Sequence, residues 1–270
     1  MSFYPLFNIL DSEGFVNLAN FPPNDWEIKE ASDKNIHAFW SDGDQWISRN
    51  AGILLEGNFK EFKTSDFFEN KSPELINGVY ITDLVFLQLR QDKLHGKMAT
   101  IPDCNSKSTV WPEWRATIGF RRKESQVSYQ GEITATPDKA TLLTFHPFIQ
   151  YDDAENFLVF VNMEKSPLSR WSNLYILNGS TRENITTLKV RNNAVNVVPL
   201  DVFGFKPTDL PVFFCESMAG IPFGFAKAKT TAMLSLEHTH PPASLTLFGD
   251  RFQAQKYVKT EWSKFFNIGK

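Results

Sequence analysis

Alternation of apolar and polar residues with a period of two predicts β-strands through most of the chain from residue 78 onward. The clearest pattern spans residues 114–133, where two alternating runs flank Arg122-Lys123-Glu124-Ser125. A hairpin turn centred between Lys123 and Glu124 joins like faces at every pair, as cross-strand packing requires. The predicted register pairs Trp114 with Ile133, Arg115 with Glu132, Thr117 with Gln130, Ile118 with Tyr129 and Phe120 with Val127.

Shorter apolar runs separated by turn residues predict further strands. Residues 157–163 are apolar on both faces, which is typical of a central strand that is covered on both sides. Residues 79–89 also alternate, but a helix over 83–94 stays open as an alternative because short apolar runs are ambiguous. The other expected strands are 174–177, 185–190, 194–200, 212–215, 223–226, 233–240 and 245–248.

The period changes at the end of the chain, where a helix is expected over about 250–266. Asp250 is suited to the N-cap, because its side chain can accept a hydrogen bond from the first turn. The helix is amphipathic and is expected to pack on the sheet; binding a membrane or a partner is the alternative. Its apolar face consists of Phe252, Val258, Trp262, Phe265 and Phe266.

These patterns predict a mainly β fold: an antiparallel sandwich or barrel-like sheets with a C-terminal amphipathic helix. Residues 1–75 contain many turn signals and few regular runs, so we expect a less regular N-terminal region packed on the main domain. Residues 76–270 form the expected β-rich domain. The pattern shows no internal repeat.

Composition narrows the classes of protein. The chain has 270 residues, 42% of them hydrophobic, which is enough for a substantial core. The net charge of −3 disfavours general nucleic-acid binding and anionic membranes. No apolar run is long enough for a transmembrane segment. The two cysteines, Cys104 and Cys215, and the lack of a signal-peptide pattern at the N-terminus favour a cytoplasmic location.

The aromatic content, with 25 Phe, 7 Trp and 6 Tyr, suits a large core and also suits sugar binding, in which ring faces stack on sugar faces. The polar face of the 114–133 hairpin could be a flat platform for a saccharide or an acidic ligand, or simply a solvated sheet face. Trp111, Arg115 and Gln130 are its candidate binding residues. Glu132 is a candidate acid, although glycosidase chemistry needs a second carboxylate that the sequence does not identify.

His238 and His240 form the other candidate site. On a strand they share a face with Leu234 and Leu236, whereas Glu237 points to the opposite face. We expect the apolar face to point inward and the histidines to lie at the sheet rim, where Pro241-Pro242 ends the strand. They could bind a ligand, transfer a proton, begin a metal site or be ordinary edge histidines. The first candidate for a third partner is His146, which also precedes a proline.

Three hypotheses about function follow. The first is a carbohydrate-related protein that binds or processes a glycan or another small polar ligand. The second is a small-molecule enzyme that uses His238 and His240, with or without a metal. The third is a non-catalytic structural or assembly protein, and a homo-oligomer fits it. The sequence identifies no cofactor, because it contains no nucleotide-binding motif.

Overall fold

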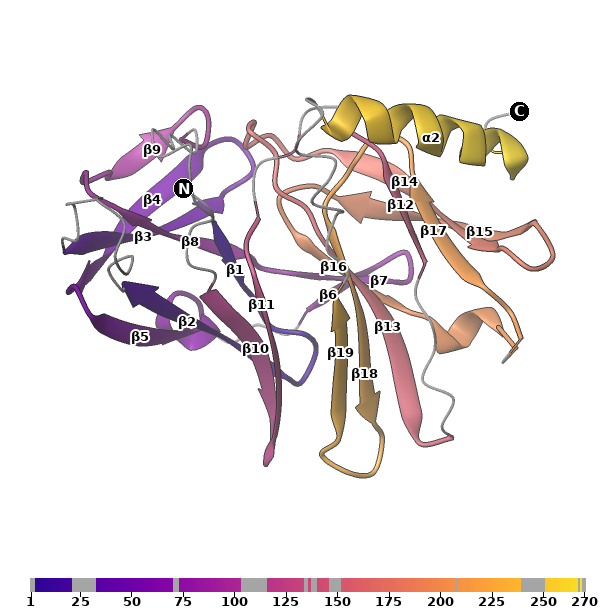
Figure 1. Cartoon of the computed structure of the whole chain (residues 1–270), viewed down its shortest axis with the longest axis horizontal. Coiled ribbons are helices and arrows are strands. Elements are labelled where there is room, and N and C mark those ends of the chain that lie inside the picture. The colour runs from indigo at the N-terminus through magenta and orange to yellow at the C-terminus, as the bar shows by residue number, and fades with distance from the viewer. Residues whose placement is uncertain are drawn as a thin grey trace, which may run out of the picture. The chain divides into compact units, whose positions relative to one another are not determined.

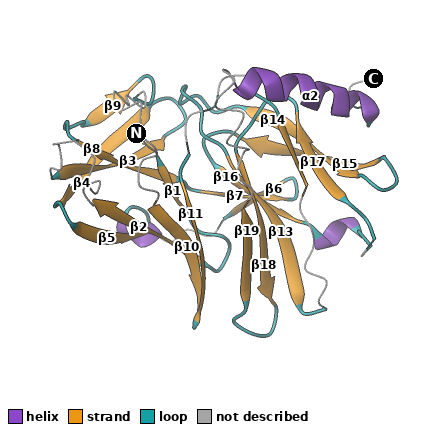
Figure 2. Ribbon diagram, in the orientation of Figure 1, coloured by secondary structure: helices purple, strands orange, loops and turns teal. Residues whose placement is uncertain are grey.

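The computed structural model describes residues 3–20, 33–69, 73–102, 116–133, 136, 140–145, 152–206, 208–238, 251–266 and 268. It confirms the predicted mainly β class, with antiparallel sheets and a C-terminal helix (Figures 1 and 2). The chain divides into two compact units. Unit 1 comprises Met1–Ser72, Asp83–Thr134 and Lys165–Ser169, and unit 2 comprises Pro73–Thr82, Ala135–Glu164 and Arg170–Lys270.

Unit 1 consists of two antiparallel sheets, one in the order β1-β8-β3-β4-β9 and the other in the order β11-β10-β2-β5. A short 3-10 helix, η1 (Thr64–Asp66), follows β5. The strands are β1 (Tyr4–Leu6), β2 (Glu13–Asn20), β3 (Lys34–Ser41), β4 (Trp46–Leu54), β5 (Asn58–Lys63), β8 (Val85–Arg90), β9 (Gly96–Met98), β10 (Ala116–Arg122) and β11 (Ser125–Gly131).

The core of unit 1 lies between its two sheets. Ile36 and Leu87 extend into it from the five-stranded sheet, and Val16, Ile118 and Phe62 extend from the four-stranded sheet. Alternate residues of each strand supply this core, because successive side chains of a strand point to opposite faces. The arrangement is that of a sandwich.

Unit 2 also has two antiparallel sheets, in the orders β12-β17-β14-β15 and β19-β18-β13-β16-β7-β6. A 3-10 helix, η2 (Asp201–Phe203), follows β16, and α2 (Arg251–Phe265) ends the unit. The strands are β6 (Glu74–Ile76), β7 (Val79–Thr82), β12 (Leu142–Phe145), β13 (Ala154–Val161), β14 (Trp171–Asn178), β15 (Glu183–Arg191), β16 (Val195–Pro199), β17 (Pro211–Cys215), β18 (Ile221–Ala228) and β19 (Leu234–His238).

Unit 2 has an internal core between its sheets and a second apolar cluster under the helix. Leu174 and Phe213 of the four-stranded sheet meet Leu158 and Phe160 of the six-stranded sheet in the core. On the outer face of the four-stranded sheet, a smaller cluster from β14 and β17 packs against Phe266, next to the end of α2 (Figure 1). The predicted C-terminal helix therefore packs on its own sheet.

The two units share one strand connectivity, which the sequence pattern did not reveal. The corresponding strands follow one another in the same chain order in both units. They are β1, β2, β3, β4, β5, β8, β10 and β11 in unit 1 and β12 through β19 in unit 2. In unit 1, β2 lies between β10 and β5, and β3 lies between β4 and β8; in unit 2, β13 lies between β18 and β16, and β14 lies between β15 and β17. Even η1 and η2 follow corresponding strands. The additions are β9 in unit 1 and the β6–β7 hairpin in unit 2.

The structure confirms several local predictions. β10 and β11 pair in the expected register, with Phe120 opposite Val127 and Thr117 opposite Gln130. β13 is a central strand, covered as expected. The helical alternative for residues 83–94 is wrong, because β8 pairs with two strands there. Trp114, Arg115 and the expected strand 245–248 lie outside the described residues, and the division into 1–75 and 76–270 stays a prediction.

Candidate functional site

His238 lies at the end of β19, an edge strand, and its partner across the sheet is Phe223 of β18. The two rings are 5.1 Å apart between centroids and tilted by 36°. Glu237 points to the opposite face, as the strand parity predicts, and is exposed. His240 and His146 lie outside the described residues, so a site built from these histidines stays a prediction.

The face that carries His238 corrects one expectation. We predicted that it continues the inward core stripe, but Phe223 lies on the face of the six-stranded sheet opposite to Leu158 and Phe160, which form the sandwich core. Phe223 and its neighbour Val159 are nevertheless fully buried. Because the central strands β13 and β16 of this sheet are buried on both faces, apolar alternation does not indicate which face points into the sandwich.

The polar face of the β10–β11 hairpin exists as predicted, and Gln130 is exposed on it. Its main cation, Arg121, is already engaged. Nη1 and Nη2 of Arg121 donate to the two carboxylate oxygens of Glu61 at 2.5 and 2.7 Å, and Nε donates to Gln126 at 2.9 Å. The hydrogen bonds that Glu61 accepts from Arg121 lower the pKa of the Glu61 carboxyl group. Trp111 and Arg115 lie outside the described residues.

Glu132 follows the last residue of β11 and is half-buried. Its charge acts on Tyr129: burial, and then the nearby Glu132 carboxylate, raise the pKa of the Tyr129 phenol well above its usual range. Both effects keep the phenol protonated, because each disfavours a second negative charge there. A catalytic role for Glu132 stays a prediction.

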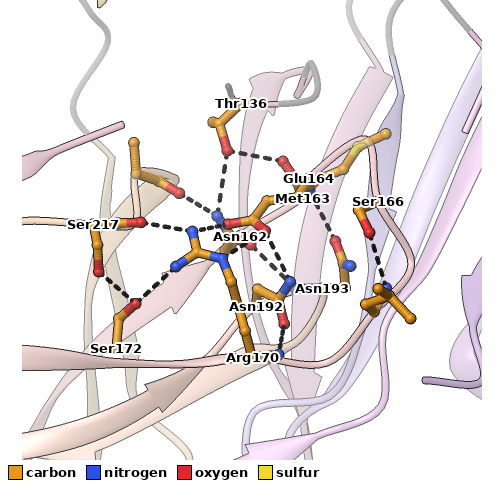
Figure 3. A network of polar contacts seen from close by, with 12 residues as sticks. Thr136, Asn162, Met163, Glu164, Ser166, Arg170, Ser172, Asn192, Asn193 and Ser217 are labelled. Carbon is orange, nitrogen blue, oxygen red and sulfur yellow. Dashed lines mark hydrogen bonds and ion pairs between the residues drawn. The ribbon is translucent and has the colours of Figure 1, made fainter. Parts of the chain in front are cut away.

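A buried polar network in unit 2 was not foreseen from the sequence (Figure 3). Arg170 binds Glu164 through two parallel hydrogen bonds, from Nε at 2.9 Å and from Nη2, and the Glu164 side chain is only 2% exposed. Asn192 donates to the same carboxylate at 2.9 Å, while its own side-chain oxygen accepts from the Arg170 backbone N–H at 2.8 Å. From the sequence, Asn192-Asn193 indicates only a turn.

The network extends to two serines beside Cys215. Arg170 donates from Nη1 to the Ser172 hydroxyl at 3.0 Å and from Nη2 to the Ser217 carbonyl at 2.6 Å. The two serine hydroxyl oxygens are 2.8 Å apart. Burial raises the pKa of the Cys215 thiol to about 11, which keeps it protonated and a poor nucleophile at neutral pH. The hydrogen bonds of Arg170 therefore link β14 to the chain that follows β17, beside a thiol that is protonated at neutral pH.

A different surface has the character of a ligand platform. Trp171, the first residue of β14, is 43% exposed, and its cross-strand partner on β15 is Arg191. Two residues further along, Asn173 is paired with the exposed Lys189. These four residues share the outer face of the four-stranded sheet, because the intervening Ser172 and Val190 are buried. We call Trp171, Asn173, Lys189 and Arg191 the Trp171 face.

The C-terminal end of helix α2 lies near the other end of β14 and β15. Phe266 packs with Leu177, near the turn that joins β14 to β15, and the guanidinium of Arg182 in that turn lies 4.3 Å from the centre of the Phe265 ring. The Trp171 face is at the opposite end of the two strands from this turn. Sequence reasoning missed it, because the predicted strand began only at residue 174.

Comparison with known proteins adds no assignment: no family model, curated protein or solved structure matches the chain. Within the described ranges, no three His, Cys, Asp or Glu side chains are grouped closely enough to hold a metal ion. In that same part of the chain, no helix has both the length and the apolar character that crossing a membrane requires.

Proposed function

We propose that the protein binds a glycan on the Trp171 face of unit 2. The observation that supports this most directly is the exposed indole of Trp171 on the same solvent-facing strand pair as Asn173, Lys189 and Arg191. An indole ring stacks on the apolar face of a sugar, because the C–H groups of the sugar meet the electron-rich ring face. Polar side chains beside the ring bind the hydroxyl groups.

The sheet makes the face flat and holds it in place. Leu174 and Val190, on the inner side of the same strands, are fully buried in the core of unit 2. Side chains directly opposite on antiparallel strands lie about 4.5–5.5 Å apart at Cβ, and diagonal neighbours about 7–8 Å apart. Trp171 and Arg191 are directly opposite, and Trp171 and Lys189 are diagonal, so one sugar residue with its substituents can reach all three.

The platform first expected on the β10–β11 hairpin has weaker support. There, Arg121 lies 4.0 Å over the centre of the Phe15 ring and is paired with Glu61, so both the ring and the cation are engaged within the protein. A ligand would have to displace these contacts. The Trp171 face requires no such displacement.

Two other hypotheses remain. An enzyme that uses His238 and His240, with or without a metal, would be supported by stoichiometric metal in the purified protein or by loss of an activity in His238→Ala. A non-catalytic assembly protein would be supported by a stable oligomer in size-exclusion chromatography with light scattering. Glycan binding is preferred because an exposed ring beside free polar groups is already present in one face.

A glycan array that contains neutral and acidic saccharides tests the proposal, followed by titration calorimetry with each saccharide that binds. We expect Trp171→Ala to weaken binding about tenfold, since losing one aromatic contact costs about 1.4 kcal/mol. The matched control is Phe59→Ala, which removes a 73% exposed ring from unit 1 and should leave binding unchanged. No binding to any saccharide, or equal affinities for Trp171→Ala and the wild type, would contradict the proposal.

A further inference from the structure

We infer that the ligand of the Trp171 face is an anionic saccharide, in which a carboxylate or sulfate group binds between Lys189 and Arg191 while the sugar ring stacks on Trp171. This inference rests on the proposed glycan binding and adds the chemical class of the ligand. Its basis is the positive charge of the face and a comparison of Arg191 with the arginines that are bound to carboxylates.

The two cations of the face are uncompensated. Neither Lys189 nor Arg191 forms an ion pair or a side-chain hydrogen bond with any residue in the described part of the chain, and the face contains no carboxylate. The chain as a whole carries a net charge of −3, so acidic side chains are not scarce. Two unpaired cations in one place create a local positive potential that attracts an anionic group.

In the described ranges, three other arginines, unlike Arg49 and Arg182, are held by carboxylates through two hydrogen bonds each. Arg121 binds Glu61, Arg90 binds Asp92 and Arg170 binds Glu164, each through two hydrogen bonds from the guanidinium. Arg191 is partly buried as well, yet it has no such carboxylate among the described residues. A guanidinium fork matches the two oxygens of a carboxylate or sulfate group, so an external anion would give Arg191 the arrangement that Arg90, Arg121 and Arg170 have within the fold.

The backbone of Arg191 is held in position. Its N–H donates to the Asn196 side-chain oxygen at 2.7 Å, and its carbonyl accepts from the Asn196 side-chain nitrogen at 2.9 Å. Asn196 is fully buried, so this double contact anchors the end of β15 from inside. A fixed Cα beside Trp171 reduces the entropy lost when the guanidinium binds an anion.

The corresponding strands of unit 1 lack these features. There, β3 and β4 take the places of β14 and β15, and the outward-facing pair toward the open end of the hairpin is Asn35–Ile53. The Asn35 amide donates to the Gln91 carbonyl, and Ile53 is apolar and exposed. The aromatic ring and the cations are therefore a property of unit 2 and not a general consequence of the shared connectivity.

A single-stranded nucleic acid would also place a planar group and an anion on an aromatic, cationic face. Proteins that bind such strands use a positively charged groove and several stacking rings. The Trp171 face has one ring and two cations, in a chain with a net negative charge. These observations favour a saccharide, and an oligonucleotide becomes an arm of the test.

The test compares three polymers with one backbone: neutral dextran, carboxymethyl dextran and dextran sulfate, with a twelve-nucleotide single strand as the fourth ligand. We expect the full-length protein to bind at least one charged dextran about tenfold or more tightly than the neutral polymer. The double variant Lys189→Gln/Arg191→Gln should remove this difference, whereas Lys123→Gln, at the exposed turn of the unit 1 hairpin, should keep it. The preferred polymer distinguishes carboxylate from sulfate.

The outcomes separate the two proposals. If binding requires Trp171 but is equal for neutral and charged dextrans, the glycan proposal survives and the anionic inference is wrong. If the charged polymers bind equally to the wild type, Trp171→Ala and the double variant, their attraction is non-specific and the inference is also wrong. Tighter binding of the oligonucleotide than of any dextran would replace the saccharide. Circular dichroism and thermal unfolding of each variant verify that it is folded.

Discussion

The two units have the same strand connectivity but differ in the polarity of one outward-facing residue pair on the corresponding sheet. We count outward-facing pairs from the β3–β4 turn in unit 1 and from the β14–β15 turn in unit 2. The second such pair is His37–Gln88, between β3 and β8, in unit 1. In unit 2 it is Tyr175–Phe214, between β14 and β17. In unit 2 this pair belongs to the apolar cluster with Phe266. In unit 1 the polar pair is fully buried.

Hydrogen bonds reach only one side-chain polar atom of each residue of this pair, and among the described residues His37 Nδ1 and Gln88 Nε2 have no partner. Nε2 of His37 lies 3.1 Å from the Asp92 carbonyl oxygen, and Gln88 accepts a hydrogen bond from Arg90 at 2.9 Å. Buried polar groups are expensive unless they are bonded in this way. The comparison shows that inner-face packing and backbone pairing are sufficient to define the connectivity, while the outer face of the sheet is free to differ.

The same contrast applies to charge. Each unit has an arginine bound to a glutamate by two hydrogen bonds, but Glu164 is only 2% exposed, whereas Glu61 and Arg121 are each 31% exposed. Arg170 itself is 33% exposed, so only the Glu164 carboxylate is removed from water, and this buried charge cannot be solvated when Arg170 is lost. A pair that is partly in water contributes little.

The largest expected loss of stability comes from breaking the ion pair between Glu164 and Arg170. Arg170→Ala takes two hydrogen bonds from the buried Glu164 carboxylate, which keeps the one from Asn192, and should lower the free energy of unfolding by about 3–5 kcal/mol. The matched change in unit 1, Arg121→Ala, leaves the partly exposed Glu61 and should cost less than about 1 kcal/mol. Urea unfolding of both variants measures the difference. Similar losses in the two variants would show that the units do not differ in this respect.

A smaller loss of stability is expected when the apolar cluster under α2 in unit 2 is disturbed. Phe266→Ala removes a buried ring from the cluster under α2 and should lower the free energy of unfolding by about 2–3 kcal/mol, below the loss typical of a fully enclosed Phe because the chain end can relax. Tyr257→Ala, at a 72% exposed position of the same helix, should change it by less than about 0.5 kcal/mol. The idea that the helix stabilises unit 2 fails if the Phe266 variant unfolds like the wild type.

The smallest effect is the pH dependence of stability that comes from His37 in unit 1. Burial lowers the pKa of His37 below 6.5, and the positive charge of Arg90 acts in the same direction. Below pH 6.5 the unfolded chain therefore binds a proton that the folded chain excludes, so stability falls as the pH drops through this value. His37→Phe, which places a ring where unit 2 has Tyr175, should flatten the stability profile between pH 7 and pH 5. An unchanged slope would mean that His37 does not contribute.

Local pattern was enough to predict some elements in detail. The β10–β11 register followed from alternation on both sides of Lys123-Glu124, because a short hairpin brings its own neighbours together. The candidate sites were less predictable. Trp171 preceded the recognised apolar run, and Glu164 and Arg170 meet across a loop whose path no periodicity describes. The face occupied by His238 was misjudged because the central strands of its sheet are buried on both faces.

The sequence alone determined the mainly β class, the positions of many strands along the chain, the β10–β11 hairpin and the terminal helix, because period and turn chemistry act between residues that are close in the chain. Tertiary structure decided the rest: the repeated connectivity, the division of charges into paired and unpaired, and the solvent-facing position of Trp171 beside Lys189 and Arg191. These depend on which distant strands become neighbours, and two units with the same connectivity can reach it with different side chains, because strands pair through a backbone that all residues share.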